Sequence, residues 1–241
     1  MIHNIAHRGA SAYEPENTLR AFARAIELGA TQIELDVHLS RDGKLVVVHD
    51  PNLARTTDGT GRVSDLTLAE IQRLDAGQGE HIPTLAEVID RVRGKLQLYI
   101  ELKGQQTPAA TVATLREKDF IDQAIVGSFY PWLPQKAKFL EPALRTSVLV
   151  GWRDHQADFI EWAVAVEADY IHLCWESGSP QPHQLLSQEL LASIRRRGMG
   201  IVLWHEERAD ELVELAKLDV YGICTNTPDV LASILGMKDK T

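Results

Sequence analysis

The sequence predicts an α/β protein whose fold is a single (β/α)8 barrel. Short apolar runs rich in β-branched residues alternate with segments of about ten residues that have helical spacing, a pattern typical of a parallel sheet with helical connections. Nine such runs occur, but the second and third are too close together for a helix to connect them. Counting those two as one elaborated strand leaves eight strand–helix units, and a length of 241 residues suits one barrel.

Composition agrees with a soluble globular chain and restricts its partners. The chain is 44% hydrophobic and 24% charged, and its net charge of -9 argues against broad binding to nucleic acid or stable association with an anionic membrane. The two cysteines, Cys174 and Cys224, fall in strand-like runs and are interpreted as core residues. No signal-peptide pattern and no apolar run of about 18 residues is found, so a cytoplasmic location is expected.

The predicted strands follow the chain as Ile2–Ala6, Gln32–Leu39, Leu45–His49, Leu96–Leu102, Ala124–Ser128, Thr146–Val150, Tyr170–Leu173, Ile201–Trp204 and Gly222–Thr225. The second and third are expected to form an antiparallel hairpin with Asp42-Gly43 as a two-residue turn. Paired residues would then have numbers that sum to 85, which places His49 opposite Asp36 unless a bulge shifts the register by one.

Helical spacing predicts helices at Leu19–Leu28, Leu85–Val92, Ala109–Glu117, Leu133–Phe139, Ala157–Val166, Gln188–Arg196, Ala209–Lys217 and Asp229–Ile234. Thr84 and Glu87 have the spacing of a capping box, and Asn17 is expected to cap the first helix. A stretch rich in Gly and Thr, with one short helical pattern at Leu68–Leu74, follows the hairpin. We expect one domain over residues 1–241 with a small inserted cap at about 51–83, over the mouth of the barrel.

Polar residues gather where the predicted strands end, which is where active sites of such barrels lie. Glu34 and Asp36 are two residues apart, so their side chains point to the same face of a strand. The full set at these positions is His7, Arg8, Glu34, Asp36, His49, Asp50, Glu101 and Lys103. Such residues are costly to bury singly, so their convergence at one mouth indicates a functional site.

This set of side chains suits the cleavage of a phosphoester. The carboxylates of Glu34, Asp36 and Glu101 are hard oxygen ligands that fit one Mg²⁺ or Ca²⁺ better than zinc. Two cationic side chains can bind phosphate oxygens, and two histidines can exchange protons near neutral pH. The alternative is a purely structural ion-pair network between the carboxylates and the cations.

Ordered motifs along nearly the whole chain resemble those of the glycerophosphodiester phosphodiesterase family. They are His7-Arg8-Gly9, Pro15-Glu16-Asn17-Thr18, Glu34-Leu35-Asp36-Val37, Arg41-Asp42-Gly43, His49-Asp50, Ile82-Pro83-Thr84-Leu85, Ile100-Glu101-Leu102-Lys103, Ser128-Phe129 and Thr225-Asn226-x-Pro228. The resemblance implies a TIM-type barrel of the phospholipase C-like phosphodiesterases with a cap after the second strand. It also implies hydrolysis of a small glycerophosphodiester to sn-glycerol 3-phosphate and an alcohol, with one divalent cation.

By position, the resemblance also implies roles for individual residues. They are His7 and His49 as the acid–base pair, Glu34, Asp36 and Glu101 as metal ligands, and Arg8 and Lys103 as phosphate contacts. Family members often carry a Trp-Thr-Val-Asn-like run at the end of the penultimate strand, whereas this chain has His205-Glu206-Glu207 after Trp204. Trp204 is expected to give an apolar wall for the glycerol group, and His205 is a candidate third ionisable group at the mouth.

Two other functions compete with this prediction. A lysophospholipase D-type reaction on a singly acylated substrate would need an apolar rim, and the predicted cap is mostly polar. A catalytically silent phosphodiester-binding protein would not need both histidines and all three carboxylates, which are in place.

Overall fold

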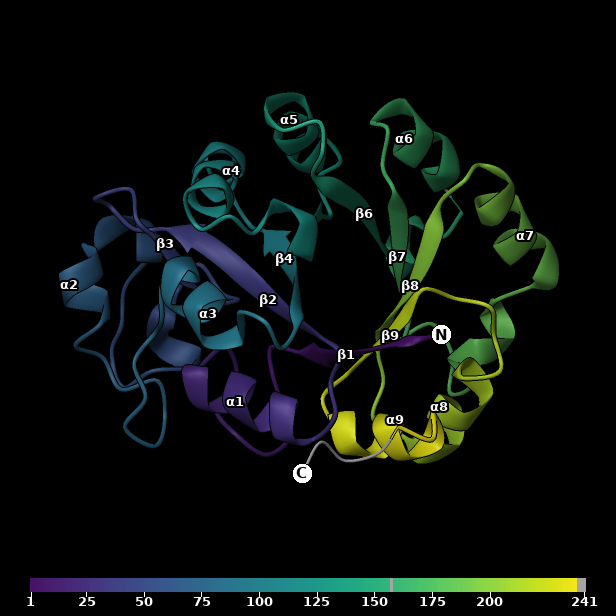
Figure 1. Ribbon diagram of the computed structural model, residues 1–241, viewed down its shortest axis with the longest axis horizontal. Coiled ribbons are helices and arrows are strands. Elements are labelled where there is room, and N and C mark those ends of the chain that lie inside the picture. The colour runs from purple at the N-terminus through teal and green to yellow at the C-terminus, as the bar shows by residue number, and fades with distance from the viewer. Residues whose placement is uncertain (157, 238–241) are drawn as a thin grey trace.

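The computed structural model describes residues 1–156 and 158–237, and within them eight parallel strands close into a barrel. Neighbouring strands follow the order β1-β9-β8-β7-β6-β5-β4-β2, and β1 pairs with β2 to close the ring. The strands are β1 (His3–His7), β2 (Gln32–Leu39), β3 (Leu45–Val47), β4 (Gln97–Leu102), β5 (Ala124–Ser128), β6 (Arg145–Gly151), β7 (Tyr170–Cys174), β8 (Gly200–His205) and β9 (Gly222–Thr225). The predicted barrel is confirmed (Figure 1).

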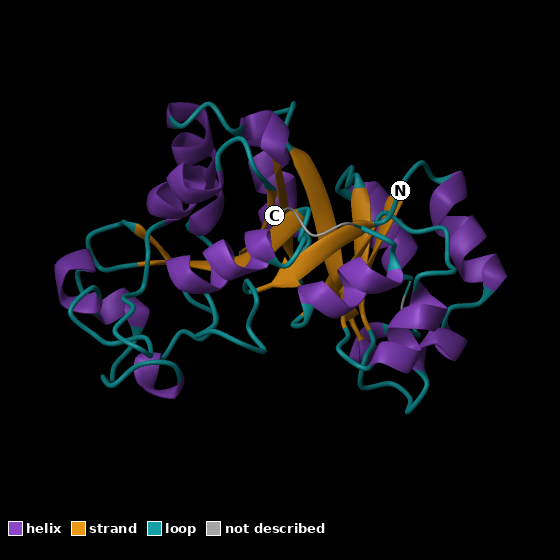
Figure 2. Ribbon diagram, turned by 60° about the horizontal axis from the view of Figure 1, so that its bottom comes forward, coloured by secondary structure: helices purple, strands orange, loops and turns teal. Residues whose placement is uncertain are grey.

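Helices and strands alternate along most of the chain, and Figure 2 shows the helices on the outside of the strands. The helices are α1 (Leu19–Glu27), α2 (Leu68–Ile71), α3 (Leu85–Val92), α4 (Thr107–Glu117), α5 (Trp132–Leu140), α6 (Phe159–Ala165), α7 (Gln188–Arg196), α8 (Ala209–Leu215) and α9 (Pro228–Ile234). Ala157, the first residue of one predicted helix, lies outside the described residues. No helix of the described chain is long and apolar enough to cross a membrane.

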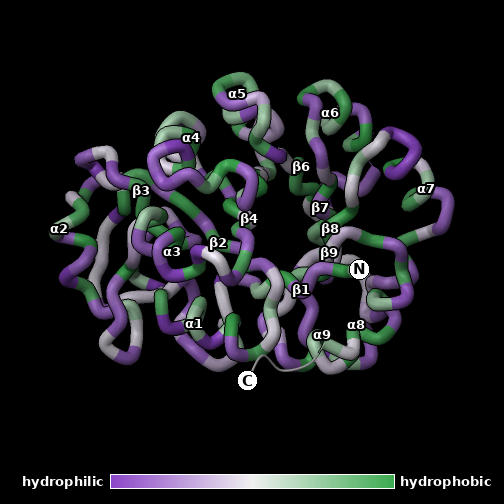
Figure 3. Tube along the Cα trace, viewed as in Figure 1, coloured by the Kyte–Doolittle hydropathy of each residue, from purple (hydrophilic) through white to green (hydrophobic). Residues whose placement is uncertain are grey.

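Most strand residues are buried on both faces of the sheet, and the outward positions of β2 (Ile33, Leu35 and Val37) are all apolar. The inward side chains form one small cluster that fills the barrel: Ile5, Tyr99, Ile125, Leu149, Val202 and Cys224. The outward side chains pack against the helices in two larger clusters, one around β2 and β4 and the other around β7 and β8. Figure 3 shows hydrophobic and hydrophilic residues mixed along the strands, because the polar residues of the barrel mouth lie on the same strands as the core.

The hairpin between β2 and β3 has a register one residue away from the predicted one. Leu39 pairs with Leu45 and Val37 with Val47, so the numbers of paired residues sum to 84 rather than 85. The cause is a three-residue turn in which Gly43 has a φ of +73°, a left-handed conformation that glycine adopts without strain. The predicted pairing of Asp36 with His49 is therefore wrong, and β3 ends before His49.

Residues 51–83 form an insertion after the β2–β3 hairpin. Two 3-10 turns, η1 (Leu53–Arg55) and η2 (Val63–Asp65), and the short helix α2 pack around a separate hydrophobic cluster that includes Leu53, Val63 and Ile71. Helix α2 stops at Ile71, earlier than the predicted Leu74. In Figure 1 the insertion lies at one side, beyond β3, and not across the centre of the ring.

Candidate active site

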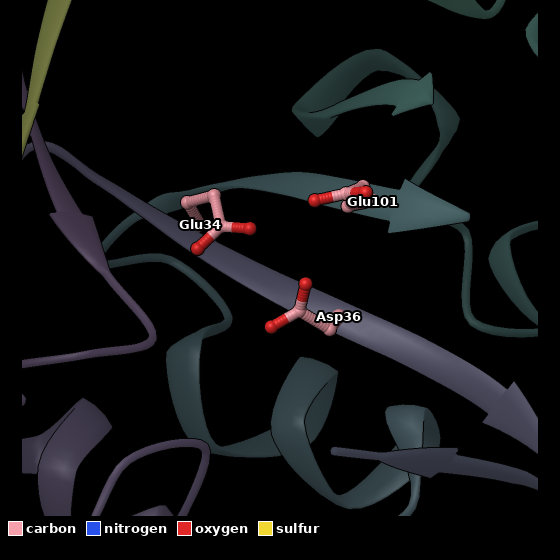
Figure 4. Close-up of side chains that lie close together, drawn as sticks. All are labelled: Glu34, Asp36 and Glu101. Carbon is pink, nitrogen blue, oxygen red and sulfur yellow. The ribbon is translucent and has the colours of Figure 1, made fainter. Parts of the chain in front are cut away.

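Three carboxylates converge at the carboxyl ends of β2 and β4. Glu34 and Asp36 project from β2, and the parallel register places Glu101 of β4 directly beside Asp36. One oxygen atom from each of the three carboxylates lies within 4.8 Å of the others, and Figure 4 shows the side chains gathered there. Their exposed fractions are only 4%, 1% and 6% in chain order. The structure thus brings together the three predicted metal ligands.

Burial and mutual repulsion shift the acidity of this cluster. Burial, followed by the charge of Asp36, raises the pKa of Glu34 well above its usual range. Burial likewise raises the pKa of Glu101 to about 7, although Lys103 opposes the shift. Without a bound metal ion, three carboxylates this close together are therefore poorly stabilised when all three are charged. Their oxygen atoms are hard donors, so the cluster fits a divalent cation of the Mg²⁺ or Ca²⁺ type.

Two cationic side chains flank the cluster. The Lys103 Nζ lies 3.1 Å from Asp36 Oδ1 and 2.7 Å from Glu101 Oε1. The Arg8 Nε lies 3.4 Å from Asp36 Oδ2, and the backbone amide of Arg8 donates a hydrogen bond to Glu34 Oε2 at 3.1 Å. Burial would raise the pKa of Asp36, but Lys103 and Arg8 together lower it below its usual range. Asp36 is thereby kept ionised.

Asn17 has a role that differs from the predicted helix cap. Its side-chain Nδ2 donates a hydrogen bond to Asp36 Oδ2 at 3.0 Å. The cap of α1 is Thr18, whose side chain accepts from the amide of Ala21. Asn17 itself has a φ of +59°, a left-handed conformation that asparagine tolerates better than most residues. The turn before α1 therefore serves the carboxylate cluster as well as the helix.

His7 sits at the end of β1 beside the carboxylates. Its Nε2 is 4.0 Å from Glu34 Oε2, and its Nδ1 is 2.7 Å from the side-chain Oδ1 of Asn226. The His7 ring stacks on that of His205, with centroids 4.4 Å apart and an angle of 9° between the planes. Burial, followed by the charges of Arg8 and His205, lowers the pKa of His7 well below its usual range. His7 is therefore neutral at pH 7 in this environment.

His49 belongs to a hydrogen-bonded chain that crosses from the insertion to the first loop. Its Nδ1 lies 2.6 Å from Asp50 Oδ1, and Arg55 of the insertion donates from Nε to Asp50 Oδ2 at 2.5 Å. Arg55 also makes two hydrogen bonds of 2.8 Å to the carboxylate of Glu16, which accepts a third of 3.0 Å from Arg8. The bond from Arg55 lowers the pKa of Asp50 to about 2. Asp50 is thus an ionised partner of His49.

These groups surround a cavity of about 210 Å³. Its lining includes His7, Arg8, Glu34, His49 and Glu101 from the predicted set, together with Phe129, Leu149, His172, Cys174, Glu176, His205 and Cys224. Among the additional residues, His172 is buried and its Nδ1 lies 3.2 Å from the hydroxyl of Tyr99. The cavity is therefore polar on the side of β1, β2 and β4 and mixed on the opposite side.

The position of Trp204 does not fit the predicted wall of the glycerol site. Its side chain is 0% exposed and belongs to the hydrophobic cluster between the barrel and the helices. The pairing of β8 with β9 is irregular between Leu203 and His205, so the strict alternation of side chains fails there. As a result His205 takes the inward position and lines the cavity instead of Trp204.

Five further residues support the site by hydrogen bonds: Glu16, Asp50, Arg55, Glu207 and Asn226. Asp50 belonged to the predicted set at the mouth, and both Asp50 and Asn226 directly follow a predicted strand, which indicated a role there. Arg55 and Glu207 carry no such signal, because each acts through a contact with a residue far away in the sequence.

Comparison with known proteins assigns the chain to a family. The model of the glycerophosphoryl diester phosphodiesterase family matches residues 7–230. A glycerophosphodiester phosphodiesterase of Caldanaerobacter subterraneus is 35% identical over 96% of this chain and 96% of its own. The crystal structure of such an enzyme from Agrobacterium tumefaciens is 30% identical, with a TM-score of 0.84 over 97% of this chain and all of that one. An Oleispira antarctica phosphodiesterase, solved with the product sn-glycerol-3-phosphate, is 28% identical with a TM-score of 0.85 over 96% of each chain. The chain belongs to the glycerophosphoryl diester phosphodiesterase family.

Proposed function

We propose that this protein hydrolyses small glycerophosphodiesters to sn-glycerol 3-phosphate and an alcohol. The observation that carries the proposal is the buried cluster of Glu34, Asp36 and Glu101, beside a cavity that His7 and His49 both line, in a chain of this family. The product found in the Oleispira relative supports the same substrate class.

In the proposed mechanism, the three carboxylates hold one divalent cation, Mg²⁺ or Ca²⁺. When bound, the cation supplies positive charge that stabilises the negative charge developing on the phosphate oxygens. Arg8 offers a planar guanidinium for two phosphate oxygens, and Lys103 adds a point charge on the other side of the cluster. Both cations already contact Asp36, so the phosphate and the carboxylates would share them.

His7 and His49 are proposed as the acid–base pair. The Nδ1 of His7 is hydrogen-bonded to Asn226 and that of His49 to Asp50, which leaves each Nε2 to exchange a proton. One ring accepts a proton from the attacking hydroxyl of water or of the substrate glycerol. The other donates a proton to the oxygen of the departing alcohol as the phosphorus–oxygen bond breaks. Attack by water gives sn-glycerol 3-phosphate directly, whereas attack by the glycerol hydroxyl gives a cyclic phosphate, which water then opens to the same product.

A metal-titrated product assay tests this function. The purified protein is treated with chelator and offered glycerophosphocholine, glycerophosphoethanolamine and a lysophosphatidylcholine, and Mg²⁺ or Ca²⁺ is then restored. We expect sn-glycerol 3-phosphate to appear from the two deacylated substrates only when metal is present. Release from the lysophospholipid alone would instead support the lysophospholipase D-type reaction. No turnover of any substrate by folded protein would favour a binding protein.

Replacing one carboxylate tests the metal site without relying on turnover. Glu34→Gln removes one buried charge but keeps the shape of the side chain. We expect metal to raise the melting temperature of the wild-type protein, because a ligand that binds only the folded state stabilises it. The shift should be much smaller in Glu34→Gln. Glu117→Gln, at the exposed end of α4, is the matched control and should keep the full shift. Equal shifts in all three proteins would refute the assignment of Glu34 as a ligand.

A further inference from the structure

Two residues that follow β8 and β9 form a hydrogen-bonded link to His7. We propose that Glu207 is a positioning residue, which acts through Asn226 to select the ring tautomer of His7. This inference rests on the proposed acid–base role of His7. It concerns the segment His205-Glu206-Glu207, which follows Trp204 at the end of β8.

The contacts run without a gap from the exposed surface to the cavity. Glu207 Oε2 accepts a hydrogen bond of 2.5 Å from the side-chain Nδ2 of Asn226. The Oδ1 atom of the same Asn226 amide lies 2.7 Å from Nδ1 of His7. Glu207 and Asn226 follow β8 and β9, and His7 is the last residue of β1; these strands are neighbours in the barrel, so the sheet itself sets the spacing of the three residues (Figure 1). The backbone of Asn226 is also held, because its carbonyl accepts from the amide of Ala12.

Glu207 decides which way the Asn226 amide points. A side-chain amide can be rotated by 180° so that its oxygen and nitrogen exchange places, and both orientations fit the same space. An ionised carboxylate only accepts hydrogen bonds, so the amide nitrogen must face Glu207. The amide oxygen must then face His7 and Ser11. Without Glu207, the neighbouring Ser11 hydroxyl would accommodate either orientation, because a hydroxyl both donates and accepts.

The orientation of the amide fixes the proton on the His7 ring. With the amide oxygen facing Nδ1, that nitrogen must carry the hydrogen in the neutral ring, and Nε2 has the lone pair. Nε2 is the atom that lies 4.0 Å from Glu34 and that the proposed chemistry uses. The rotated amide would stabilise the opposite tautomer, with a hydrogen on Nε2 and the lone pair on Nδ1. The stacked ring of His205 restrains the plane of His7 but does not distinguish its two nitrogens.

Three surface variants separate this role from a general effect of charge. Glu207→Ala removes the acceptor, and we expect kcat to fall roughly tenfold or more with KM little changed, as for other residues that orient a functional histidine. In Glu207→Gln the new side-chain amide can both donate and accept, so it no longer fixes the orientation of Asn226, and kcat should fall as it does in Glu207→Ala. Asp210→Ala removes a nearby exposed charge at the start of α8 and should match the wild type. If Glu207→Gln keeps the kcat of the wild type, a group that only accepts is not needed to orient the amide and the proposal is wrong.

The ¹⁵N chemical shifts of the His7 ring report the tautomer directly and do not depend on turnover. In the wild-type protein at neutral pH we expect Nδ1 protonated and Nε2 not, with the resonance assigned by its loss in His7→Gln. Glu207→Ala should give a mixture of tautomers, and an unchanged spectrum would overturn the proposal. If the wild-type protein turns over none of the substrates, it is the proposed function that fails, and if His7→Ala remains active, it is the acid–base role of His7 that fails. If His7→Ala is inactive while Glu207→Ala has the kcat of the wild type, only the positioning role fails.

Discussion

At the scale of single residues, each carboxylate of the cluster is stabilised by contacts of a different kind. Glu34 accepts a hydrogen bond from the backbone amide of Arg8. Asp36 accepts one from Asn17 and contacts both cations, whereas Glu101 contacts Lys103. The two cations neutralise buried carboxylates, and the proposed function gives them a second role in binding phosphate. Removing Lys103 should raise the pKa of both Asp36 and Glu101, because its charge lowers both.

The histidine assignments predict a large loss of turnover without loss of the fold. His7→Ala and His49→Ala should each lower kcat by about 100-fold or more, the range typical of a positioned proton donor or acceptor. Both side chains lie at the edge of the cavity and not in a hydrophobic cluster, so circular dichroism and the melting temperature should change little. Initial rates of sn-glycerol 3-phosphate release at saturating metal measure the effect.

A third histidine provides the control for these variants. His81 is half-exposed and forms an ion pair of 3.5 Å with Glu87, away from the cavity. His81→Ala should retain the kcat of the wild type. Turnover near that of the wild type in His7→Ala or His49→Ala would exclude the corresponding ring from the proposed acid–base pair.

At the scale of elements, the turn from β1 to α1 determines the geometry of Arg8. Arg8 and Gly9 have φ values of +56° and +83°, and a Cβ atom on Gly9 would lie 2.8 Å from the backbone and side chain of Ala21 in α1. We expect Gly9→Ala to lower the free energy of unfolding by more than about 2 kcal/mol, because it combines an unfavourable φ with a steric clash. Urea unfolding measures the change, and the displaced turn should also lower kcat/KM.

The variant Gly43→Ala separates the effect of the unfavourable φ from that of the steric clash. Gly43 has a φ of +73° in the β2–β3 turn, but a Cβ atom there would meet no neighbour within 4 Å. Gly43→Ala should therefore cost only about 1 kcal/mol, the conformational part alone. Equal losses in the two variants would mean that the contact of the turn with α1 contributes nothing.

The insertion contributes to the site through Arg55, which bridges Asp50 and Glu16. Arg55→Ala should lower kcat/KM roughly tenfold, because Asp50 and Glu16 orient His49 and Arg8 and both lose their bridging partner. The free energy of unfolding should change by less than about 1 kcal/mol, since the pair is exposed to water. Steady-state kinetics measure the effect, and Arg62→Ala, an exposed arginine of the same insertion, is the control. Equal kinetics in the two variants would contradict a role for the insertion in the site.

Sequence periodicity was sufficient to predict most elements. Strands β2, β5 and β9 and helices α3 and α7 begin and end at the predicted residues. Errors arose where one extra or missing residue changes which way side chains point. The three-residue turn at Gly43 and the irregular pairing at Leu203 are such places. Turn type and bulges depend on how strands meet, which a local hydrophobic pattern does not record.

The candidate site shows the same limit at longer range. The carboxylates were predictable, because residues two apart on a strand share a face and parallel strands end at one edge of the barrel. The link of Arg55 to Glu16 joins residues 39 positions apart, and that of Glu207 to Asn226 joins residues 19 apart. Neither spacing has a period that secondary structure would produce, so only the folded chain reveals these contacts.

At the scale of the whole molecule, the barrel holds together only if its first and last strands meet. β1 pairs with β9 on one side and with β2 on the other, so residues at the start of the chain complete the ring. The same strand delivers His7, and β9 is followed directly by Asn226. Closure of the barrel and assembly of the His7 side of the site are thus one event.

Asn4 joins segments near the two ends of the chain, so replacing it measures how much this contact contributes to the free energy of unfolding of the barrel. Its fully buried side-chain Nδ2 donates to the carbonyl oxygens of Gly29 and Pro228 at 3.2 and 2.8 Å, which ties β1 to the loop after α1 and to the start of α9. Asn4→Ala would leave both carbonyls without this donor, so we expect the free energy of unfolding to fall by about 2 kcal/mol or more.

The control is Asn52→Ala, which removes the cap of η1 in the insertion and should lower the free energy of unfolding by about 1 kcal/mol. Urea unfolding, followed by both tryptophan fluorescence and activity, distinguishes the two. In Asn4→Ala both signals should shift together to lower urea, because the ring and the site are lost together. A loss of activity well before the fluorescence change would show that the His7 side opens while the barrel stays closed.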